Sequence, residues 1–229
     1  MVRKHLKKMR GRFAYLFISL LLLLLVYPFF KQEAFETVIL WILGLFVFGA
    51  AIYADSDSKD HTFIASSLGI SYLLLSFMNL FLNNVVFSGL VTIVAVLFFA
   101  YTIKLIIDHI LNHHEVTPNT VYGAACVYML LGIIFASVFH FATLVDPSSF
   151  TTEVETMDYG DSLYFSFVTL TTVGYGDISP DSEVVRSLSV FEAVLGQLYL
   201  AVLVALLIAN ILPRRRAKKK RSYVQKTLK

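Results

Sequence analysis

Two glycines stand one residue apart in the run Thr171–Asp177, whose sequence is TTVGYGD. Glycine adopts positive φ without a Cβ penalty. Gly174 and Gly176, alternating with Val173 and Tyr175, therefore allow successive carbonyl oxygens to point to one side of the chain. A row of such oxygens can replace the hydration shell of a cation. The spacing thus permits a backbone site for a dehydrated cation, and the competing interpretation is a glycine-containing reverse turn.

The residues just before this run predict a short helix. Positions 158–171 begin with acidic side chains and continue with apolar ones. About a dozen residues are too few to cross a bilayer. Such a segment can enter the membrane partway and return where protein or water surrounds the non-helical backbone that follows.

Six longer apolar segments lie along the chain, five before this half-helix and one after it. Each approaches the roughly 20 residues that a helix needs to cross a hydrocarbon core of about 30 Å. A hydrophobic content of 57% and a mean hydropathy of +0.72 exclude an ordinary soluble protein. The fold class is therefore an all-α membrane protein with six transmembrane helices. The predicted spans are Phe13–Phe30, Glu36–Tyr53, Thr62–Leu82, Val85–Ile107, Thr120–Leu144 and Ser187–Leu212.

Basic residues gather in the two terminal segments, 1–12 and 213–229. Lys and Arg beside spanning helices favour the cytoplasmic side, so both termini are expected in the cytoplasm of a multi-pass protein of the cell membrane. An even number of spans follows, and the acidic connection 145–186 lies outside. We expect the basic ends to contact anionic lipid; nucleic-acid binding is the alternative and is not favoured.

The run Thr171–Asp177, after a half-helix and between two spans, resembles the selectivity filter of the tetrameric potassium channel superfamily. The resemblance implies passive potassium conduction without catalysis or a cofactor, with K⁺ as the permeant ion. It implies that potassium is coordinated at Thr172, Val173, Gly174 and Tyr175, and that Gly176 completes the filter. Because the chain carries one such run and a ring needs four, it also implies a homotetramer.

The same resemblance divides the chain into domains. A four-helix domain in the place of a voltage sensor precedes a pore module of outer helix, pore helix, filter and inner helix. The predicted boundaries are a basic N-terminus at 1–12, the sensor-like domain at 13–110, a linker at 111–119, the pore domain at 120–212 and a basic tail at 213–229.

The last span carries further candidate pore residues. Gly196 lies at the position where the resembling family often bends its inner helix, and close packing against a neighbouring helix is the alternative that stays open. Residues on the same helical face predict the cavity and inner mouth, where an apolar ring can gate by excluding water. These residues are Gln197, Leu200, Val204, Ile208 and Leu212.

The chain departs from the family around its filter. Tyr164 and Phe165 stand where many members carry tryptophans, and Val168 stands where some carry a buried glutamate. Tyr164 keeps a hydroxyl that can hydrogen-bond Asp177 and support the filter from outside. Thr171 completes the predicted support.

The sensor-like domain lacks the charges that a voltage sensor requires. Each charge that crosses the membrane field contributes only about 2.3 kcal/mol per 100 mV, so a steep response needs several. The fourth span carries Lys104 alone. We therefore predict only shallow voltage dependence.

Histidines gather after the fourth span. His109 and His113 share a helical face beside Asp108, and His114 and Glu115 follow. This cluster can bind a metal or sense pH. A solvated linker helix without either role is the favoured interpretation.

Two other functions remain open. The first is a weakly selective cation channel, and the second is a non-conducting membrane sensor or partner subunit that keeps the pore fold. The sequence shows no nucleophile–base pair, phosphate loop or cofactor motif, so we predict no enzymatic activity.

Overall fold

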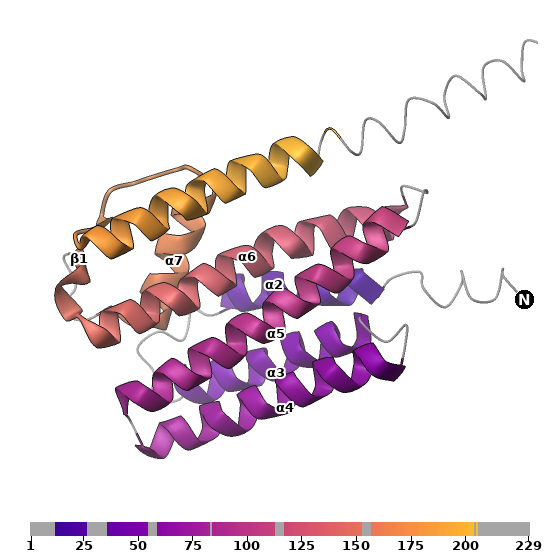
Figure 1. Cartoon of the computed structure of the whole chain (residues 1–229), viewed down its shortest axis with the longest axis horizontal. Coiled ribbons are helices and arrows are strands. Elements are labelled where there is room, and N and C mark those ends of the chain that lie inside the picture. Colours follow the sequence, from indigo (N-terminus) through magenta and orange to yellow (C-terminus); the bar gives the residue numbers. More distant parts are fainter. Residues whose placement is uncertain are drawn as a thin grey trace, which may run out of the picture.

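The computed structural model describes residues 12–26, 36–54, 59–82, 84–112, 117–152, 157–203 and 205. Long helices lie side by side, and a short helix is held between two of them near one end (Figure 1). The elements are α2 (Arg12–Val26), α3 (Glu36–Ala54), α4 (Lys59–Leu82), α5 (Val85–Asn112), α6 (Pro118–Val145), η2 (Pro147–Ser149), β1 (Phe150–Thr152), α7 (Tyr159–Leu170) and β2 (Ile178–Pro180). A last helix, Glu183–Leu203, follows and is called the inner helix here.

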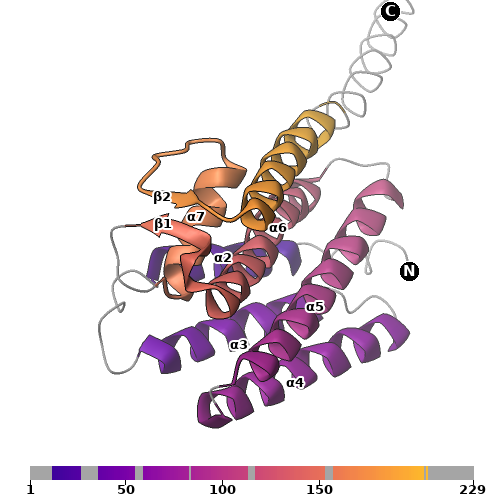
Figure 2. The same ribbon diagram turned by 60° about the vertical axis from the view of Figure 1, so that its left-hand side comes forward.

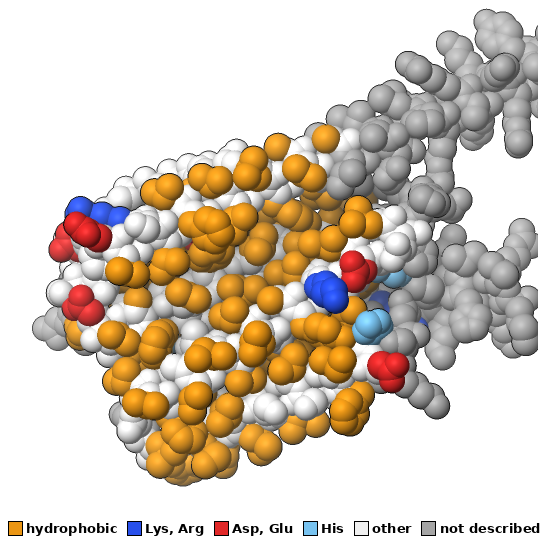
Figure 3. Space-filling model, in the orientation of Figure 1, with side chains coloured by type: hydrophobic (Ala, Val, Ile, Leu, Met, Phe, Trp, Pro, Cys, Tyr) orange, Lys and Arg blue, Asp and Glu red, His pale blue; other side chains and the backbone are white. Residues whose placement is uncertain are grey.

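Four of the described helices are long and apolar enough to cross a membrane, namely Asp60–Asn79 within α4, α5, α6 and the inner helix. Arg12–Val26 and Gly44–Tyr53 are shorter apolar helices. Hydrophobic side chains cover the middle of the face in Figure 3, and charged ones gather at its two ends. The helical membrane fold is therefore confirmed, whereas the count of six spanning helices stays a prediction.

Several helices extend beyond their predicted ends. The fourth predicted span continues past Ile107 to Asn112, because polar residues at an interface do not interrupt a helix. The fifth begins at Pro118 rather than Thr120: Thr117 forms a capping box with Thr120, and proline suits the first helical position. The inner helix begins at Glu183, not Ser187. The linker predicted at 111–119 is correspondingly shorter.

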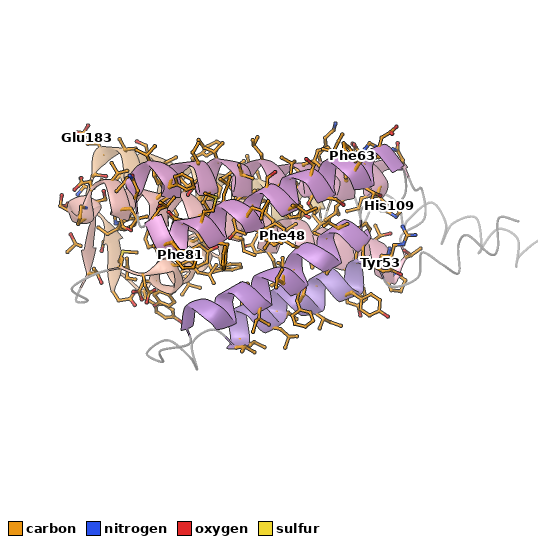
Figure 4. All side chains as sticks on the ribbon, turned by 90° about the horizontal axis from the view of Figure 1, so that it is seen from below. Phe48, Tyr53, Phe63, Phe81, His109 and Glu183 are labelled. Carbon is orange, nitrogen blue, oxygen red and sulfur yellow. The ribbon has the colours of Figure 1, made fainter. Side chains whose placement is uncertain are left out.

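Aromatic packing fills the core of the four-helix part, α2–α5. The ring of Phe48 on α3 lies 4.6 Å from that of Tyr72 on α4 and 4.4 Å from that of Phe98 on α5. Phe48 points between the helices in Figure 4. This part packs directly on α6 of the same chain through α5 and through α2, whose Phe13 ring lies where Gly123 has no side chain.

A small antiparallel ribbon, not foreseen from the sequence, joins the segments before and after the half-helix. Phe150 pairs with Pro180 and Thr152 with Ile178 (Figure 2). The ribbon lies at the end of the bundle opposite to the first residues of α2 and the last described residues of the inner helix. Glu183 accordingly lies far from Tyr53 and His109 (Figure 4). The first described residues of α2 and the last described residues of the inner helix therefore lie at the same end of the bundle.

Candidate functional site

The half-helix α7 is fixed by a capping box. Asp158 accepts a 2.7 Å hydrogen bond from the backbone N–H of Asp161, and the Asp161 side chain accepts one from the N–H of Asp158 at 3.2 Å. These bonds satisfy N–H groups that a helix start leaves free, and acidic groups suit the positive end of the helix dipole. The helix ends at Leu170 and Thr171 forms its C-cap, so TTVGYGD begins where the predicted half-helix stops.

The backbone after α7 takes left-handed conformations at every second residue. The φ angles are 60° at Thr172, 59° at Gly174 and 84° at Gly176. The two glycines adopt the geometry expected from the sequence. Thr172 was not expected to, and it is the one non-glycine residue with positive φ in the described parts of the chain. A residue held this way costs on the order of 1–3 kcal/mol and persists only where its surroundings enforce it.

The side chains that alternate with these left-handed residues are open in the single chain. Val173 is 53% exposed and Tyr175 is 73% exposed. Tyr175 stacks on Tyr164, with ring centroids 6.4 Å apart and planes at 2°. The chain therefore covers only one face of Tyr175 by itself, and it leaves Val173 half open.

The outer end of the run is held by a hydrogen bond. The Tyr164 hydroxyl on α7 donates to Asp177 Oδ2 at 2.7 Å, which is the contact that the sequence suggested. This bond raises the pKa of Tyr164 to about 12, and partial burial adds to the shift. The phenol therefore remains protonated, and able to donate, throughout the neutral range.

If the run is the filter that its sequence resembles, we expect Tyr164→Phe to leave potassium selectivity intact. The current should decay several-fold faster during prolonged opening. The substitution removes one hydrogen bond at a partly exposed site, worth about 1 kcal/mol. Tyr122→Phe is the control, since Tyr122 has a similar exposure and its ring packs on Phe17, away from the run. Current decay during prolonged opening is the measurement, and identical decay in wild type and Tyr164→Phe would show that the bond does not support the filter.

The inner end of the run faces the inner helix. Gln197 Nε2 donates to Thr172 Oγ1 at 3.4 Å, so two residues that were predicted separately lie together. Leu200, one turn further, is 39% exposed. The predicted gate residues Val204, Ile208 and Leu212 lie outside the described residues.

Gly196 lies in close contact with the end of α7. A Cβ built at this position would lie 2.7 Å from the backbone oxygen of Leu170, closer than real Cβ atoms approach a neighbour. The inner helix continues unbroken through Gly196. This geometry supports the packing interpretation, while bending at Gly196 stays a prediction.

Tyrosines, which the sequence analysis did not single out, bind the pore elements together. Tyr128 on α6 donates to the oxygen of Leu170 at 2.9 Å, and Tyr199 on the inner helix donates to the oxygen of Ala124 at 2.6 Å. Their rings stack on each other, with centroids 6.0 Å apart. A hydroxyl-bearing ring placed in an apolar span signals a buried hydrogen bond and could have been identified on that ground.

Glu192 on the inner helix was also missed. Its side chain is fully buried and touches Ser166 of α7. The signal was present in the sequence, because an ionisable residue in the middle of a membrane-length apolar run is a functional candidate by default.

Only part of the predicted histidine cluster lies within the described residues. The ring of His109 packs edge-on against Phe13 of α2, with centroids 5.1 Å apart. His113, His114 and Glu115 lie outside the described residues. Within the parts of the chain that the structure describes, no group of three or more His, Cys, Asp or Glu side chains could hold a metal ion.

A half-helix and an irregular backbone segment lie between two membrane-length helices, α6 and the inner helix. Residues 133–212 match the family model described as "Ion channel". The chain is 40% identical over 52 residues to two-pore potassium channel 2 of Arabidopsis thaliana, covering 23% of this chain and 12% of the relative. It is 37% identical over 78 residues to the potassium voltage-gated channel protein shk-1 of Caenorhabditis elegans, covering 34% and 14%.

A third relative is potassium channel subfamily K member 16 of Homo sapiens, 36% identical over 52 residues, which cover 23% of this chain and 17% of the relative. Residues 133–212 of this multi-pass membrane protein thus match an ion-channel family model, and the chain is similar over part of its length to potassium channels. The matched segments span less than a fifth of the length of these relatives.

Proposed function

We propose that the chain is one subunit of a potassium-selective channel that conducts K⁺ passively through the backbone carbonyls of Thr172, Val173, Gly174 and Tyr175, with Gly176 completing the filter. The observation that carries this proposal is the left-handed backbone at Thr172, Gly174 and Gly176, directly after a half-helix. Alternating backbone handedness is what a row of inward carbonyls requires, and such a row replaces the ion's water.

The proposed assembly is a homotetramer around a shared filter. One chain supplies one strand of carbonyls. Backbone carbonyl groups that lack polar partners are energetically unfavourable within lipid. The half-open Val173 and Tyr175 support this assembly, because a neighbouring subunit would cover them and fix the filter diameter. The inner helix likewise exposes large apolar side chains, including Val190, Val194 and Leu198.

The proposed ion path continues inward from the filter. The Thr172 hydroxyl, held by Gln197, contributes to the innermost site, and Leu200 lines the cavity below. The negative C-terminal end of α7 favours a cation there. Val204, Ile208 and Leu212 remain the proposed inner mouth and gate. Both termini face the cytoplasm of the cell membrane, where their basic residues contact anionic lipid, and nucleic acid is not a partner.

Potassium flux from liposomes that contain the purified protein tests this function. We expect potassium to pass at least about a hundredfold faster than sodium, with native mass spectrometry in mild detergent showing four chains. Equal passage of both ions would instead support a weakly selective cation channel. A tetramer without flux at any voltage would support a non-conducting sensor or partner subunit, and a conducting monomer or dimer would refute the shared filter.

We expect a shallow conductance–voltage curve that Lys104→Gln leaves nearly unchanged. Lys104 is the one Lys or Arg of the fourth span, and the buried side chains of this span that face Phe48 are the aromatic rings of Phe98 and Phe99. Its exposed side chain lies near the helix end, where the amine reaches water. The measurement is patch-clamp recording of both proteins over a wide voltage range. A steep wild-type curve that flattens in the variant would show that this domain senses voltage.

A further inference from the structure

Glu192 lies in the buried stripe of the inner helix. Val185, Ser189, Glu192 and Gly196 follow one another at helical spacing, and all four are buried against α6 and α7. Glu192 is fully enclosed, with none of its surface exposed. A carboxyl group in this position loses its hydration, so its hydrogen bonds decide whether it can carry charge.

The carboxyl group of Glu192 contacts the hydroxyl group of Ser166 on α7, and the same hydroxyl group contacts α6. Ser166 Oγ lies 2.5 Å from Glu192 Oε1 and 2.7 Å from the backbone oxygen of Gly132. Close helix packing brings these atoms together, because the Phe167 ring occupies the space where a side chain on Gly132 would lie, at 2.8 Å from a Cβ built there. Three pore-domain helices therefore converge on Ser166.

The single hydroxyl proton of Ser166 limits the protonation state of Glu192. The serine hydroxyl has one proton, and the carbonyl of Gly132 can only accept. If Ser166 donates to Gly132, then the short contact to Oε1 requires a proton from Glu192. If Glu192 is ionised, Ser166 must donate to it, and two oxygens then face each other across 2.7 Å without a proton between them.

The surroundings of Glu192 agree with the neutral form. Its second oxygen, Oε2, is buried and has no hydrogen-bond partner within the described part of the chain. From α6, Tyr128 lies within electrostatic range, but its hydroxyl donates to Leu170. From α7, the contacting group is the neutral Ser166. A buried carboxylate with one bare oxygen and no cation beside it would be strongly unfavourable.

We propose that Glu192 is a protonated carboxyl that donates to Ser166 and positions the pore helix between α6 and the inner helix. Ser166 in turn donates to the backbone oxygen of Gly132. The two consecutive hydrogen bonds, Glu192 to Ser166 and Ser166 to Gly132, fix α7 relative to both neighbouring helices. Because α7 carries the filter at its C-terminal end, this positioning role for conduction rests on the proposed channel function. The protonation state does not rest on it.

Infrared spectroscopy of the wild type and of Glu192→Gln, as purified protein in liposomes at neutral pH, tests the proton. We expect the wild type to show a protonated-carboxyl C=O band that disappears in Glu192→Gln and shifts in Ser166→Ala. Loss of a carboxylate band instead, with no change in the C=O region, would overturn the proposal. This measurement needs no ion flux, so it stays informative even if the protein does not conduct.

Potassium flux of the same proteins tests the positioning role. Glu192→Gln keeps a donor of the same shape and should retain flux within about twofold, whereas Glu192→Leu and Ser166→Ala should each lower it about tenfold. Native mass spectrometry selects preparations that remain assembled, and the small Ser166→Ala change guards against failure of Glu192→Leu to fold. Unchanged flux in Ser166→Ala, or equal loss in Glu192→Gln and Glu192→Leu, would overturn this role.

Discussion

Gly176→Ala should abolish the discrimination between potassium and sodium while the helices remain inserted. Gly176 has a φ of 84°, and a Cβ there would meet nothing within 4 Å. The penalty therefore comes from the backbone and not from a clash. A left-handed L-residue costs about 1–2 kcal/mol, and a ring of four incurs this cost four times around one ion path. Gly174→Ala, at a φ of 59°, should act in the same direction.

Reversal potentials under a potassium/sodium gradient measure this effect. Gly44→Ala is the matched control, because Gly44 also has open space around its Cβ position but lies within helix α3. The control should keep the wild-type reversal potential. If Gly174→Ala and Gly176→Ala both kept it as well, the carbonyl filter would have to be abandoned.

Gly196→Ala is the second substitution with a large expected effect. The added methyl group would lie 2.7 Å from the backbone oxygen of Leu170, and backbone cannot turn aside as a flexible side chain can. Either the inner helix or α7 must shift, at a cost of about 1–3 kcal/mol per subunit. We expect a lower melting temperature and a loss of most of the current.

The same variant separates the two interpretations of Gly196. If close packing is its role, stability and current fall together. If bending is its role, the melting temperature stays near that of the wild type while the open probability changes. Gly49→Ala is the control, since its Cβ position is also open. Circular dichroism melts give the melting temperature, and single-channel recordings give the open probability and the current. A variant that matches the wild type in both measurements would exclude both roles.

The half-helix and the left-handed backbone at the two glycines could be predicted because each depends on a local signal. Asp158 marks a helix start, and paired glycines mark backbone that side-chained residues avoid. The contact between Tyr164 and Asp177 was also foreseen, since both flank the same short segment. Their functional roles remain predictions that the experiments above address.

Features that depend on contacts between distant segments could not be predicted in the same way. The left-handed Thr172 has no local signal in the sequence, because threonine does not itself prefer this conformation. The ribbon pairs residues on opposite sides of the half-helix, and three-residue strands carry no periodicity to detect. Pro118 falls within the linker predicted at 111–119, whereas in the structure it occupies the first position of α6, with Thr117 as the cap before it.

Both ends of the run Thr171–Asp177 are attached to α6 and to the inner helix. At the outer end, β2 follows Asp177 directly and is paired to β1, which η2 joins to the last residues of α6; the N–H groups of Asp181 and Ser182 add bonds to the oxygen of Ser149. At the inner end, Thr172 is bonded to Gln197 of the inner helix. The inner helix is also bonded at the outer end, where Arg186 Nε donates to the oxygen of Pro180, and α6 is also bonded at the inner end, where Tyr128 donates to the oxygen of Leu170. The run therefore bridges the same pair of helices at both of its ends, and a displacement of one helix relative to the other would act on both ends together.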